Sequence, residues 1–387
     1  MKLLHVSPYA QQDPSLGGVP QAVKSISYAL SQSGHEVTIW ASDEGSATPK
    51  ASEAAERGVR TRLFRARLRV IGRALNSPVI PQLMLLDPGM IQEFDLVHLH
   101  GYWSSFTPSI ALACRKAGLP LVLQPHGTLV NSGQKELAKT VFQLLFRRQV
   151  VAATRAIVAL SDYERAQVQA AGFGTGLVRV VPNPLPTIEM SLPARAQARI
   201  ALGLPLGSLI ILYLGRLHPA KGLRELVRAY SIVRKVVPNA LLVIAGPDEG
   251  MLSQLVRLKE DARLDGMIFL GPVVEPQKWL ALRAADVMCL PSKYEGFPMT
   301  ILEAAVVRTP CVISKAVALV GLTEGASYIA SLPSPEPLAQ ALVDVLSDAG
   351  LRLRLSSNAS EEANKNFNPI RIASRLQEVY EHALRVG

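Results

Sequence analysis

The feature that most constrains the fold of this chain is an alternation of short, almost continuous apolar runs with stretches of helical period. Apolar runs without polar interruption are typical of strands buried on both faces of a parallel sheet, where helices cover both sides. The helical stretches carry end signals, such as Gly34 after 19–32 and a Ser161–Glu164 capping box at the start of 161–171. The alternation predicts an α/β fold with doubly wound sheets. The runs are LLHV (3–6), VTIW (37–40), DLVHL (95–99), PLVLQ (120–124), AIVAL (156–160), SLIILYLG (208–215), ALLVIAG (240–246), MIFLG (267–271), DVMCL (286–290) and PCVIS (310–314).

A proline-rich segment divides this alternation into two halves. The stretch VPNPLPT (181–187) holds three prolines, which prevent both a helix and a central strand. A chain of 387 residues also has the length of two domains. We therefore expect two Rossmann-like domains, 1–183 and 184–368, whose sheets face each other across a cleft. The final stretch, 369–387, is an amphipathic helix candidate that fits either domain.

The cysteines and the apolar segments indicate where such a chain works. Cys114, Cys289 and Cys311 are far apart and form no CxxC or Cys/His cluster, so neither a disulfide framework nor a thiolate metal site is expected. The N-terminal apolar run is too short for a signal peptide, and no run reaches the roughly 18 residues of a spanning helix. We expect a cytoplasmic protein, soluble or peripheral on the cytoplasmic face of the membrane.

The charge balance is basic, with 41 Lys and Arg against 31 Asp and Glu, and part of the excess is local. The segment Arg57–Arg73 holds seven arginines and no acidic residue. One interpretation is a solvated strand and loop. The other is a surface for an anionic membrane or an anionic acceptor. Nucleic acid is not an expected partner, because the segment lacks interleaved aromatic residues and the chain shows no nucleic-acid-binding motif.

Two glycine-containing loops after strands have the character of phosphate sites. Gly17-Gly18 precedes a helix expected at Val19, and a helix N-terminus with nearby glycines attracts anions. A second loop, GRLHPAKG, places Arg216 and Lys221 between a strand and a helix. Two such cations neutralise a diphosphate without a metal, although surface cations in loops are also common. Ligands of open α/β sheets bind outside the carboxyl ends of the strands, which is where both loops lie.

The third cluster is EGFPMTILEA, from Glu295 to Ala304, which follows the strand 286–290. Pro298 suits the first turn of a helix. Glu295 is then in the loop and Glu303 lies in the second turn of an otherwise apolar helix. A carboxylate there needs a hydrogen-bond partner, and sugar hydroxyls are suitable ones. The alternative is a structural acid satisfied within the core.

These three motifs, in this order and spacing, resemble the retaining glycosyltransferases of family 4 over essentially the whole chain. The resemblance implies the two-domain GT-B fold, with the 369–387 helix packing back on the first domain. It implies that Arg216 and Lys221 hold the diphosphate of a nucleotide sugar and that Glu303 accepts hydrogen bonds from the ribose. Glu295 would bind the hydroxyls of the donor sugar. The remaining expected donor-site residues are Gly17, Gly18, Val273, Val274, Gly296, Phe297, Pro298 and Met299.

The resemblance also assigns a mechanism. His126 matches a family histidine close to the transferred sugar, whereas structural or acceptor-side roles are expected for His98 and His100. The family retains the anomeric configuration, and the leaving phosphate takes the acceptor proton, so Glu295 is a positioner. No metal and no cofactor is expected, and the chain lacks an Asp-x-Asp signature. One departure is Pro184-Leu185-Pro186 where many relatives have Gly-Val-Asp, which affects the hinge only.

We therefore expect a transferase that moves a sugar from a nucleotide sugar to a glycan or lipid-linked acceptor, in the assembly of a polysaccharide or glycolipid. Two other interpretations stay open at this point. One is an epimerase, phosphorylase or sugar-phosphate synthase with the same architecture, and the other is a non-catalytic nucleotide-binding scaffold, since a fold alone does not determine function. The sequence does not specify the nucleotide base, the sugar, the acceptor or the oligomeric state.

Overall fold

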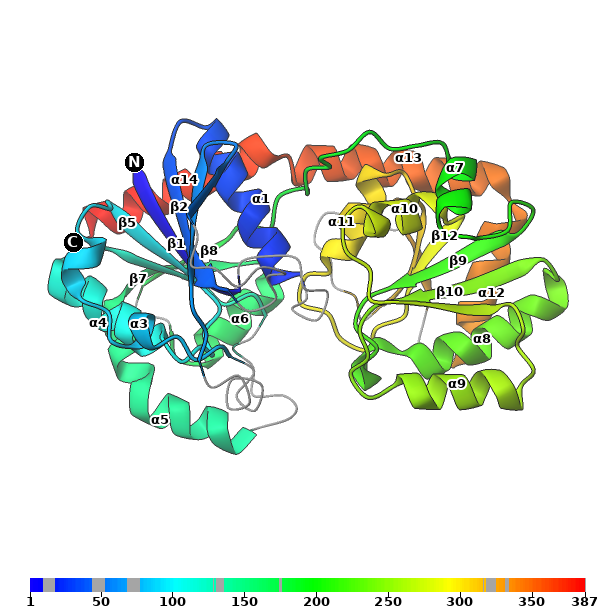
Figure 1. Ribbon diagram of the computed structural model, residues 1–387, viewed down its shortest axis with the longest axis horizontal. Helices are drawn as coiled ribbons and strands as arrows, with labels where there is room; N and C mark the ends of the chain where they lie inside the picture. The colour runs from blue at the N-terminus through cyan, green and yellow to red at the C-terminus, as the bar shows by residue number, and fades with distance from the viewer. Residues whose placement is uncertain are drawn as a thin grey trace. The chain divides into compact units, whose positions relative to one another are not determined.

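The computed structural model describes residues 1–9, 18–43, 53–67, 77–127, 129, 136–173, 176–315, 317, 325–330 and 334–386. The chain folds into two compact units (Figure 1). Unit 1 comprises residues 1–12, 19–184 and 369–387, and unit 2 comprises residues 13–18 and 185–368. The chain thus passes from unit 1 to unit 2 inside the proline-rich stretch 181–187.

Unit 1 is built on one sheet, in which the described residues form eight strands in the order β3-β4-β2-β1-β5-β6-β7-β8. All neighbours pair in parallel except β3 and β4, which form an antiparallel hairpin at one edge. The elements are β1 (Lys2–Tyr9), α1 (Val19–Gln32), β2 (Glu36–Ser42), β3 (Glu53–Glu56), β4 (Val59–Phe64), α3 (Pro81–Met84), η2 (Pro88–Ile91), β5 (Leu96–His100), α4 (Thr107–Ala117), β6 (Leu121–Gln124), α5 (Glu136–Ala153), β7 (Thr154–Ala159), α6 (Asp162–Ala170), β8 (Leu177–Val180) and α14 (Pro369–Arg385).

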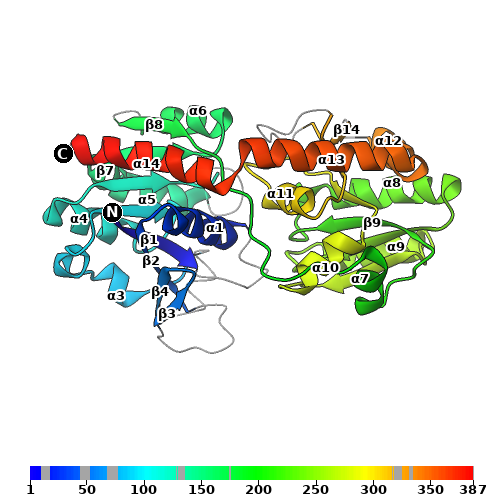
Figure 2. The same cartoon turned by 90° about the horizontal axis from the view of Figure 1, so that it is seen from above.

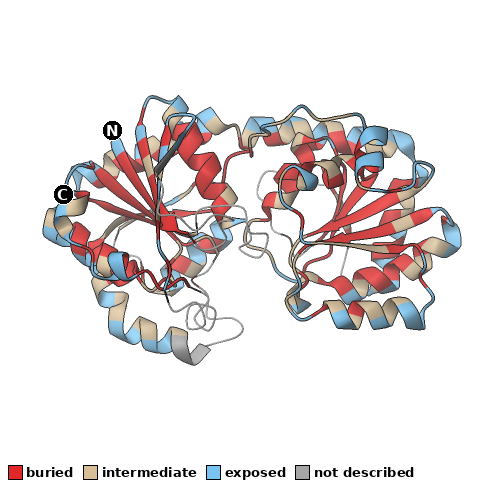
Figure 3. Ribbon diagram, in the orientation of Figure 1, coloured by how far each residue is buried: buried red, intermediate tan, exposed pale blue. Residues whose placement is uncertain are grey.

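The two faces of this sheet bury different helices. On one face, α1 and the C-terminal helix α14 lie side by side over the strands (Figure 2). Ile372, Leu376, Val379 and Tyr380 of α14 all point into that core, as the amphipathic pattern predicts. The other face is covered by α3, α4, α5 and α6, which bury residues such as Ile110. Layers of helix on both faces explain why the central strands are buried throughout (Figure 3).

Unit 2 repeats this architecture with a parallel sheet, in which the described residues form six strands in the order β11-β10-β9-β12-β13-β14. Its elements are α7 (Arg195–Ala201), β9 (Leu209–Leu214), η3 (Pro219–Lys221), α8 (Leu223–Val236), β10 (Ala240–Ala245), α9 (Leu252–Asp261), β11 (Met267–Gly271), α10 (Gln277–Ala284), β12 (Val287–Leu290), α11 (Met299–Val306), β13 (Cys311–Ser314), β14 (Tyr328–Ala330), α12 (Pro335–Ser347) and α13 (Ala349–Asn366).

The predicted apolar runs all fall on strands, so the α/β fold class with two parallel-sheet domains is confirmed. Pro298 is the N-cap of α11 rather than a residue of its first turn. The capping box at Ser161 is only half formed. The Ser161 hydroxyl accepts from the Glu164 N–H at 3.2 Å, but the Glu164 carboxylate binds the N–H of Leu160 instead of that of Ser161.

A buried ion pair anchors α7 to the sheet of unit 2. Asp286, directly before β12, accepts from the Arg199 guanidinium at 2.6 Å and from the Ile210 N–H at 2.7 Å. Arg199 also donates to three backbone carbonyl groups, at 2.8, 2.9 and 3.0 Å. Both side chains are almost completely buried. Removing one partner from such a pair leaves an uncompensated charge in the core.

We therefore expect Asp286→Ala to lower the free energy of unfolding of unit 2 by about 3–5 kcal/mol. The exposed Arg354–Asp348 pair provides a matched control, and Arg354→Ala should change it by no more than about 0.5 kcal/mol. Urea unfolding followed by circular dichroism measures both. Equal losses in the two variants would contradict the anchoring role of Asp286.

Candidate functional site

The candidate site in unit 2 begins at the carboxyl end of β9. Gly215 and Arg216 follow this strand, and the Tyr213 hydroxyl donates to the Arg216 carbonyl at 2.8 Å. The Arg216 guanidinium meets both carboxylate oxygens of Glu249, a residue that follows β10, at 2.9 and 3.0 Å. About two fifths of the Arg216 side chain is exposed (43%), so this cation stays accessible to a ligand.

The loop after β9 is joined to the loop after β12 by backbone and side-chain contacts. The Lys293 N–H donates to the Ala220 carbonyl at 2.8 Å. Gly222 has a φ of +68°, and a Cβ there would lie 1.9 Å from the Pro291 carbonyl oxygen, so only glycine fits this close approach. The Lys221 ammonium consequently lies 2.5 Å from Glu295 Oε1.

The Glu295 carboxylate is held from two sides. Besides Lys221, the Ser292 hydroxyl donates to the same Oε1 atom at 2.8 Å. The Lys221 and Glu295 side chains are largely buried, with exposures of 15% and 12%. Because the two contacts fix Oε1, the carboxylate has a defined orientation that is independent of any ligand. The structure therefore brings together two residues whose motifs are about 74 positions apart.

Glu303, on α11, has a partner that the sequence did not reveal. Its Oε1 lies 2.8 Å from the Lys278 ammonium of α10, and Glu275 lies 3.4 Å from the same ammonium. Burial alone would lower the pKa of Lys278, but the two carboxylates outweigh it and hold that pKa above its usual value. Lys278 also lies 4.5 Å from the ring centroid of Trp279. The acid in the apolar helix is thus satisfied inside the protein.

The other predicted donor-site residues of unit 2 surround the same strand ends. Gly296, Phe297 and Pro298 lead into α11, and Met299 is its first residue. The Phe297 ring packs edge-on against Phe367, with centroids 5.9 Å apart. Val273 and Val274 follow β11; Val273 is buried, whereas Val274 is 40% exposed. Gly18 directly precedes α1, and Gly17 lies outside the described residues.

Unit 1 contributes a row of histidines that lie on its central strands or follow them. His5 Nδ1 lies 2.9 Å from His100 Nε2, and His100 Nδ1 lies 2.9 Å from His126 Nε2. We call these three residues the histidine chain. His98 lies beside it, stacked on His100 at 4.1 Å and bonded through Nδ1 to the Tyr380 hydroxyl at 2.7 Å.

His126 occupies a strained backbone conformation that is held in place by a buried acid. Its φ is +56°, a region that side chains other than glycine seldom adopt and that is frequent at functional sites. Glu164 on α6 accepts hydrogen bonds from the N–H of Gly127 and, at 2.6 Å, from that of Leu160. Burial raises the pKa of Glu164, although these two N–H groups oppose the shift.

The basic segment Arg57–Arg73 is partly engaged within unit 1, and Arg69 and Arg73 lie outside the described residues. Arg60 pairs with Glu36 at 3.3 Å. Arg62 lies over the ring of Phe64 at 5.1 Å, and Arg57 over that of Tyr28 at 5.5 Å. The solvated-strand interpretation therefore fits Arg60, which is 61% exposed. Three arginines of the segment already contact other residues of unit 1.

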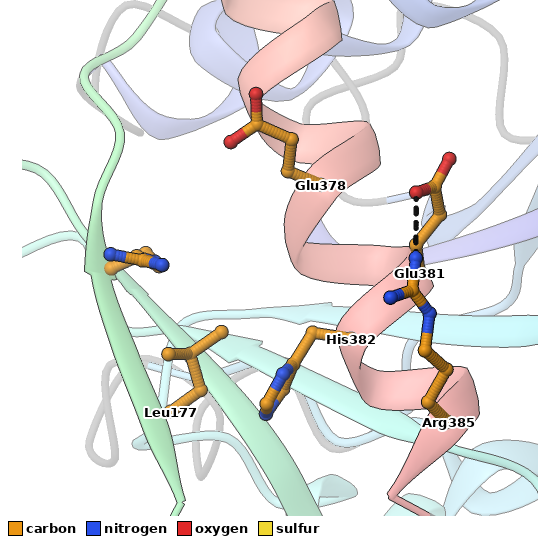
Figure 4. A pocket seen from close by; sticks show the side chains of 6 residues that line it. Leu177, Glu378, Glu381, His382 and Arg385 are labelled. Carbon is orange, nitrogen blue, oxygen red and sulfur yellow. Dashed lines mark hydrogen bonds and ion pairs between the residues drawn. The ribbon is translucent and has the colours of Figure 1, made fainter.

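A surface pocket of about 250 Å³ lies elsewhere in unit 1, between β8 and α14 (Figure 4). None of the predicted site residues lines it. Its charged groups are balanced, and Arg385 pairs with Glu381 at 3.3 Å. We assign it no role in the site. The three cysteines are buried free thiols, and no helix in the described part of the chain has the length and apolarity needed to cross a membrane.

The structure places the predicted cations and acids of unit 2 in ion pairs and His126 in the histidine chain, whereas their roles at a donor site stay predictions. The sequence did not reveal four groups that hold these residues: Glu249 on Arg216, Ser292 on Glu295, Lys278 on Glu303, and Glu164 on the loop after His126. Glu249 and Glu164 also follow or flank strand ends, so their position was a usable signal. Lys278 lies within a helix and carries no such signal.

Comparison with known proteins identifies the family. Residues 194–362 match the family model for glycosyl transferases group 1, and residues 17–184 match that for a glycosyl transferase 4-like domain. The chain is 32% identical to a D-inositol 3-phosphate glycosyltransferase of Streptomyces bingchenggensis over 316 residues, covering 76% of this chain and 67% of that protein. It is 27% identical to an Escherichia coli UDP-Gal:alpha-D-GlcNAc-diphosphoundecaprenol alpha-1,3-galactosyltransferase, covering 75% and 76% of the two chains.

A solved structure shows the same fold. The Anabaena protein HepE, in complex with UDP-glucose, matches with a TM-score of 0.74 at 18% identity, covering 98% of this chain and 99% of that one. The two family models together cover most of the chain, and the motifs at Arg216, Lys221, Glu295 and Glu303 lie inside the 194–362 match. The chain therefore belongs to the family 4-type glycosyltransferases of GT-B fold.

Proposed function

We propose that this glycosyltransferase moves a sugar from a nucleoside-diphosphate sugar to a lipid-linked or glycan acceptor, with retention of anomeric configuration and without a metal. The observation that carries the proposal is a set of three ion pairs in the loops and helices that follow the strands of unit 2, namely Arg216–Glu249, Lys221–Glu295 and Lys278–Glu303. HepE, which has the same fold, was solved with UDP-glucose. An epimerase or a non-catalytic scaffold finds no comparable support, because the relatives are glycosyltransferases.

The two cations suit the diphosphate. Arg216 is exposed, and its fork of N–H donors matches a phosphate group, so an incoming diphosphate competes with Glu249 for the same guanidinium. Lys221 adds a second charge from a largely buried position, where electrostatic interactions are stronger than in water. Together they stabilise the negative charge that grows on the leaving group, which is usually the largest catalytic contribution.

The two acids suit the sugars of the donor. Lys278 occupies Oε1 of Glu303, which leaves Oε2 to accept from the ribose hydroxyls. Glu295 is held by Lys221 and Ser292 through Oε1, which leaves its second oxygen to accept from a hydroxyl of the transferred sugar. A carboxylate that is ion-paired in this way is a weak nucleophile. This supports a positioning role and argues against a covalent glycosyl-enzyme intermediate.

The proposed reaction balances without a further reagent. The acceptor hydroxyl attacks the anomeric carbon while the bond from that carbon to the phosphate oxygen breaks. The departing phosphate oxygen, on the same face, takes the hydroxyl proton, and the nucleoside diphosphate leaves. Attack on the face that the leaving group vacates retains the configuration. In this proposal His126 contacts the transferred sugar.

The acceptor we propose is lipid-linked and is reached at the cytoplasmic membrane surface. On α5, Val141, Leu144 and Leu145 are exposed by 46%, 80% and 65%, and their spacing places them on one helix face with the exposed Arg148.

The charge around α5 is basic. Between Asp95 and Asp162 the only acidic residue is Glu136, against seven Lys and Arg. Exposed apolar and basic groups on one helix suit an anionic lipid surface. The Escherichia coli relative is named for a diphosphoundecaprenol acceptor. The segment Arg57–Arg73 is a second candidate for that surface.

A thermal-shift panel tests the donor. UDP-glucose, UDP-galactose, GDP-mannose, ADP-glucose and the matching diphosphates are each added to the pure protein in EDTA. We expect one diphosphate series to raise the melting temperature, because a ligand at 100 times its Kd stabilises by about 2.7 kcal/mol. Arg216→Ala should abolish the shift.

Sugar-transfer activity with the donor selected in this way then tests the role of Glu295. Glu295→Ala should lower turnover at least a hundredfold while leaving the melting temperature of the free protein within a few degrees. Arg224→Ala, which removes an exposed contact with Gln254, is the matched control and should retain activity. A protein that no nucleotide stabilises, or a fully active Glu295→Ala variant, contradicts the proposed function.

Vesicle co-sedimentation tests the membrane surface. Vesicles containing about a third phosphatidylglycerol should bind the wild-type protein, and the double variant Leu144→Glu and Leu145→Glu should bind at least tenfold more weakly, because the charges oppose insertion. Leu353→Glu, at an equally exposed leucine of unit 2 (69%), is the control and should bind normally. If both variants bind like the wild type, α5 is not the contact surface.

A further inference from the structure

The histidine chain of unit 1 runs from the buried sheet to His126. His5 lies on β1 and His100 on β5, and both are completely buried, whereas His126 lies after β6 and keeps partial exposure. The ring planes of successive members are close to parallel, 25° apart for His5 and His100 and 29° for His100 and His126. His100 is bonded through both of its ring nitrogens, each at 2.9 Å from a neighbouring imidazole.

In a row of hydrogen-bonded neutral imidazoles, every ring donates to the next ring in the same sense, so the row has only two possible proton arrangements. Burial lowers the pKa of His5 and of His126 to about 3 and that of His100 well below its usual value, so all three are neutral at physiological pH. A neutral imidazole has one N–H donor and one acceptor nitrogen. Because each contact holds one proton, the tautomer of His5 determines that of His100, and the tautomer of His100 determines that of His126.

The buried end of the chain selects the direction. Among the described residues, His5 Nε2 has no hydrogen-bond partner and is inaccessible to solvent. A buried N–H without an acceptor is rarer in proteins than a buried acceptor without a donor. The proton of His5 is therefore on Nδ1, which donates to His100 Nε2. His100 then carries its proton on Nδ1 and donates to His126 Nε2. That leaves the proton of His126 on its own Nδ1.

We propose that His100 and His5 are positioning residues that hold His126 as its Nδ1–H tautomer, so that His126 presents a hydrogen-bond donor to an oxygen of the transferred sugar. The tautomer assignment stands on the contacts within unit 1, whereas the role of the donor rests on the proposed function. No described residue is bonded to His126 Nδ1, and His126 is partly exposed. The strained backbone of His126, braced by Glu164 through Gly127, holds the ring in place.

A metal ion does not fit this arrangement. Ligand nitrogens of His5, His98 and His100 lie within 4.8 Å of one another. However, His98 and His100 are stacked at 4.1 Å with planes 29° apart, and imidazole lone pairs lie in the ring plane, so stacked rings do not aim at one ion. Both nitrogens of His100 are also engaged already.

The titratable groups around the chain do not supply a competing charge. His98, on the same strand as His100, has a pKa well below its usual value, chiefly through burial. The Tyr380 hydroxyl of α14, which contacts His98, has its pKa raised well above the usual value by burial and is neutral. Glu164 is directed at the N–H groups of Gly127 and Leu160. The chain of neutral rings therefore persists over the ordinary pH range.

Nitrogen-15 spectra of histidine-labelled protein read each tautomer directly, since protonated and unprotonated ring nitrogens have distinct shifts. The protein contains seven histidines. The signals of His126 are identified as those that are absent from the spectrum of the His126→Gln variant. We expect His126 in the wild-type protein to be protonated on Nδ1 and unprotonated on Nε2 from about pH 5 to about pH 8, well above its lowered pKa. His100→Leu should shift His126 towards the Nε2–H form, and His100→Asn, whose amide replaces the Nδ1 donor, should restore the wild-type tautomer.

Tyr380→Phe is the matched control, because it removes an equally buried hydrogen bond from His98, outside the chain. It should leave the His126 tautomer unchanged. With the nucleotide sugar selected by the thermal-shift panel, His100→Leu should lower kcat about tenfold with little change in KM. A tenfold decrease corresponds to the loss of about one hydrogen bond. His100→Asn should recover most of the lost kcat.

A His126 that is protonated on Nε2 or charged at neutral pH in the wild-type protein would overturn the proposal. So would an unchanged tautomer in a folded His100→Leu variant. These outcomes are read without substrate, so they are independent of the proposed function. A fully active His126→Ala variant would instead contradict the proposed contact between His126 and the sugar, and the tautomer assignment would still stand.

Discussion

The structure depends on one geometric constraint: in a parallel sheet, the carboxyl ends of all strands meet at one edge. Loops that are far apart in the chain therefore become neighbours there, and their side chains converge without any further device. In unit 2 this constraint brings Lys221, after β9, within 2.5 Å of Glu295, after β12. In unit 1 it brings His126, after β6, to His100 at the end of β5, and His5 of the neighbouring strand β1 extends the row into the sheet.

Charge pairing is the second principle of the site. Each of the cations Arg216, Lys221 and Lys278 contacts at least one carboxylate, so the site concentrates charge without leaving a buried ion uncompensated. The pairs differ in exposure, and that difference separates their roles. Arg216 is accessible, so in the proposed function it exchanges Glu249 for a phosphate, whereas Lys278 is largely buried and contacts Glu303. The histidine chain of unit 1 contains no buried ion, because its rings are neutral. Their hydrogen bonds are nevertheless directional.

Much of the fold follows from patterns that the sequence shows directly. The continuous apolar runs predicted the central strands, and the amphipathic period of α14 predicted four of the six side chains that it buries. The edge strands β3, β8 and β14 were not predicted, because edge strands are only half buried and their short, mixed sequences lack a continuous apolar run. The strand β4 was anticipated only as one interpretation of the segment Arg57–Arg73.

The site was predictable in part for a similar reason. Arg216, Lys221, Glu295 and Glu303 belong to local motifs whose spacing is visible in one dimension. Their partners are defined by contacts between segments: Lys278 reaches Glu303 across two helices, and Glu249 reaches Arg216 across two strand ends. The histidine chain is a similar case, since HLH in β5 suggested structural imidazoles but not their connection to His126.

The most direct test of this account is a crystal structure of the protein with the nucleoside diphosphate that stabilises it, grown in EDTA. The account predicts phosphate oxygens within hydrogen-bond distance of Arg216 and Lys221, a ribose hydroxyl on Glu303, and no metal between the phosphates. A diphosphate bound away from Arg216 and Lys221, or one held only through a metal ion, would contradict it.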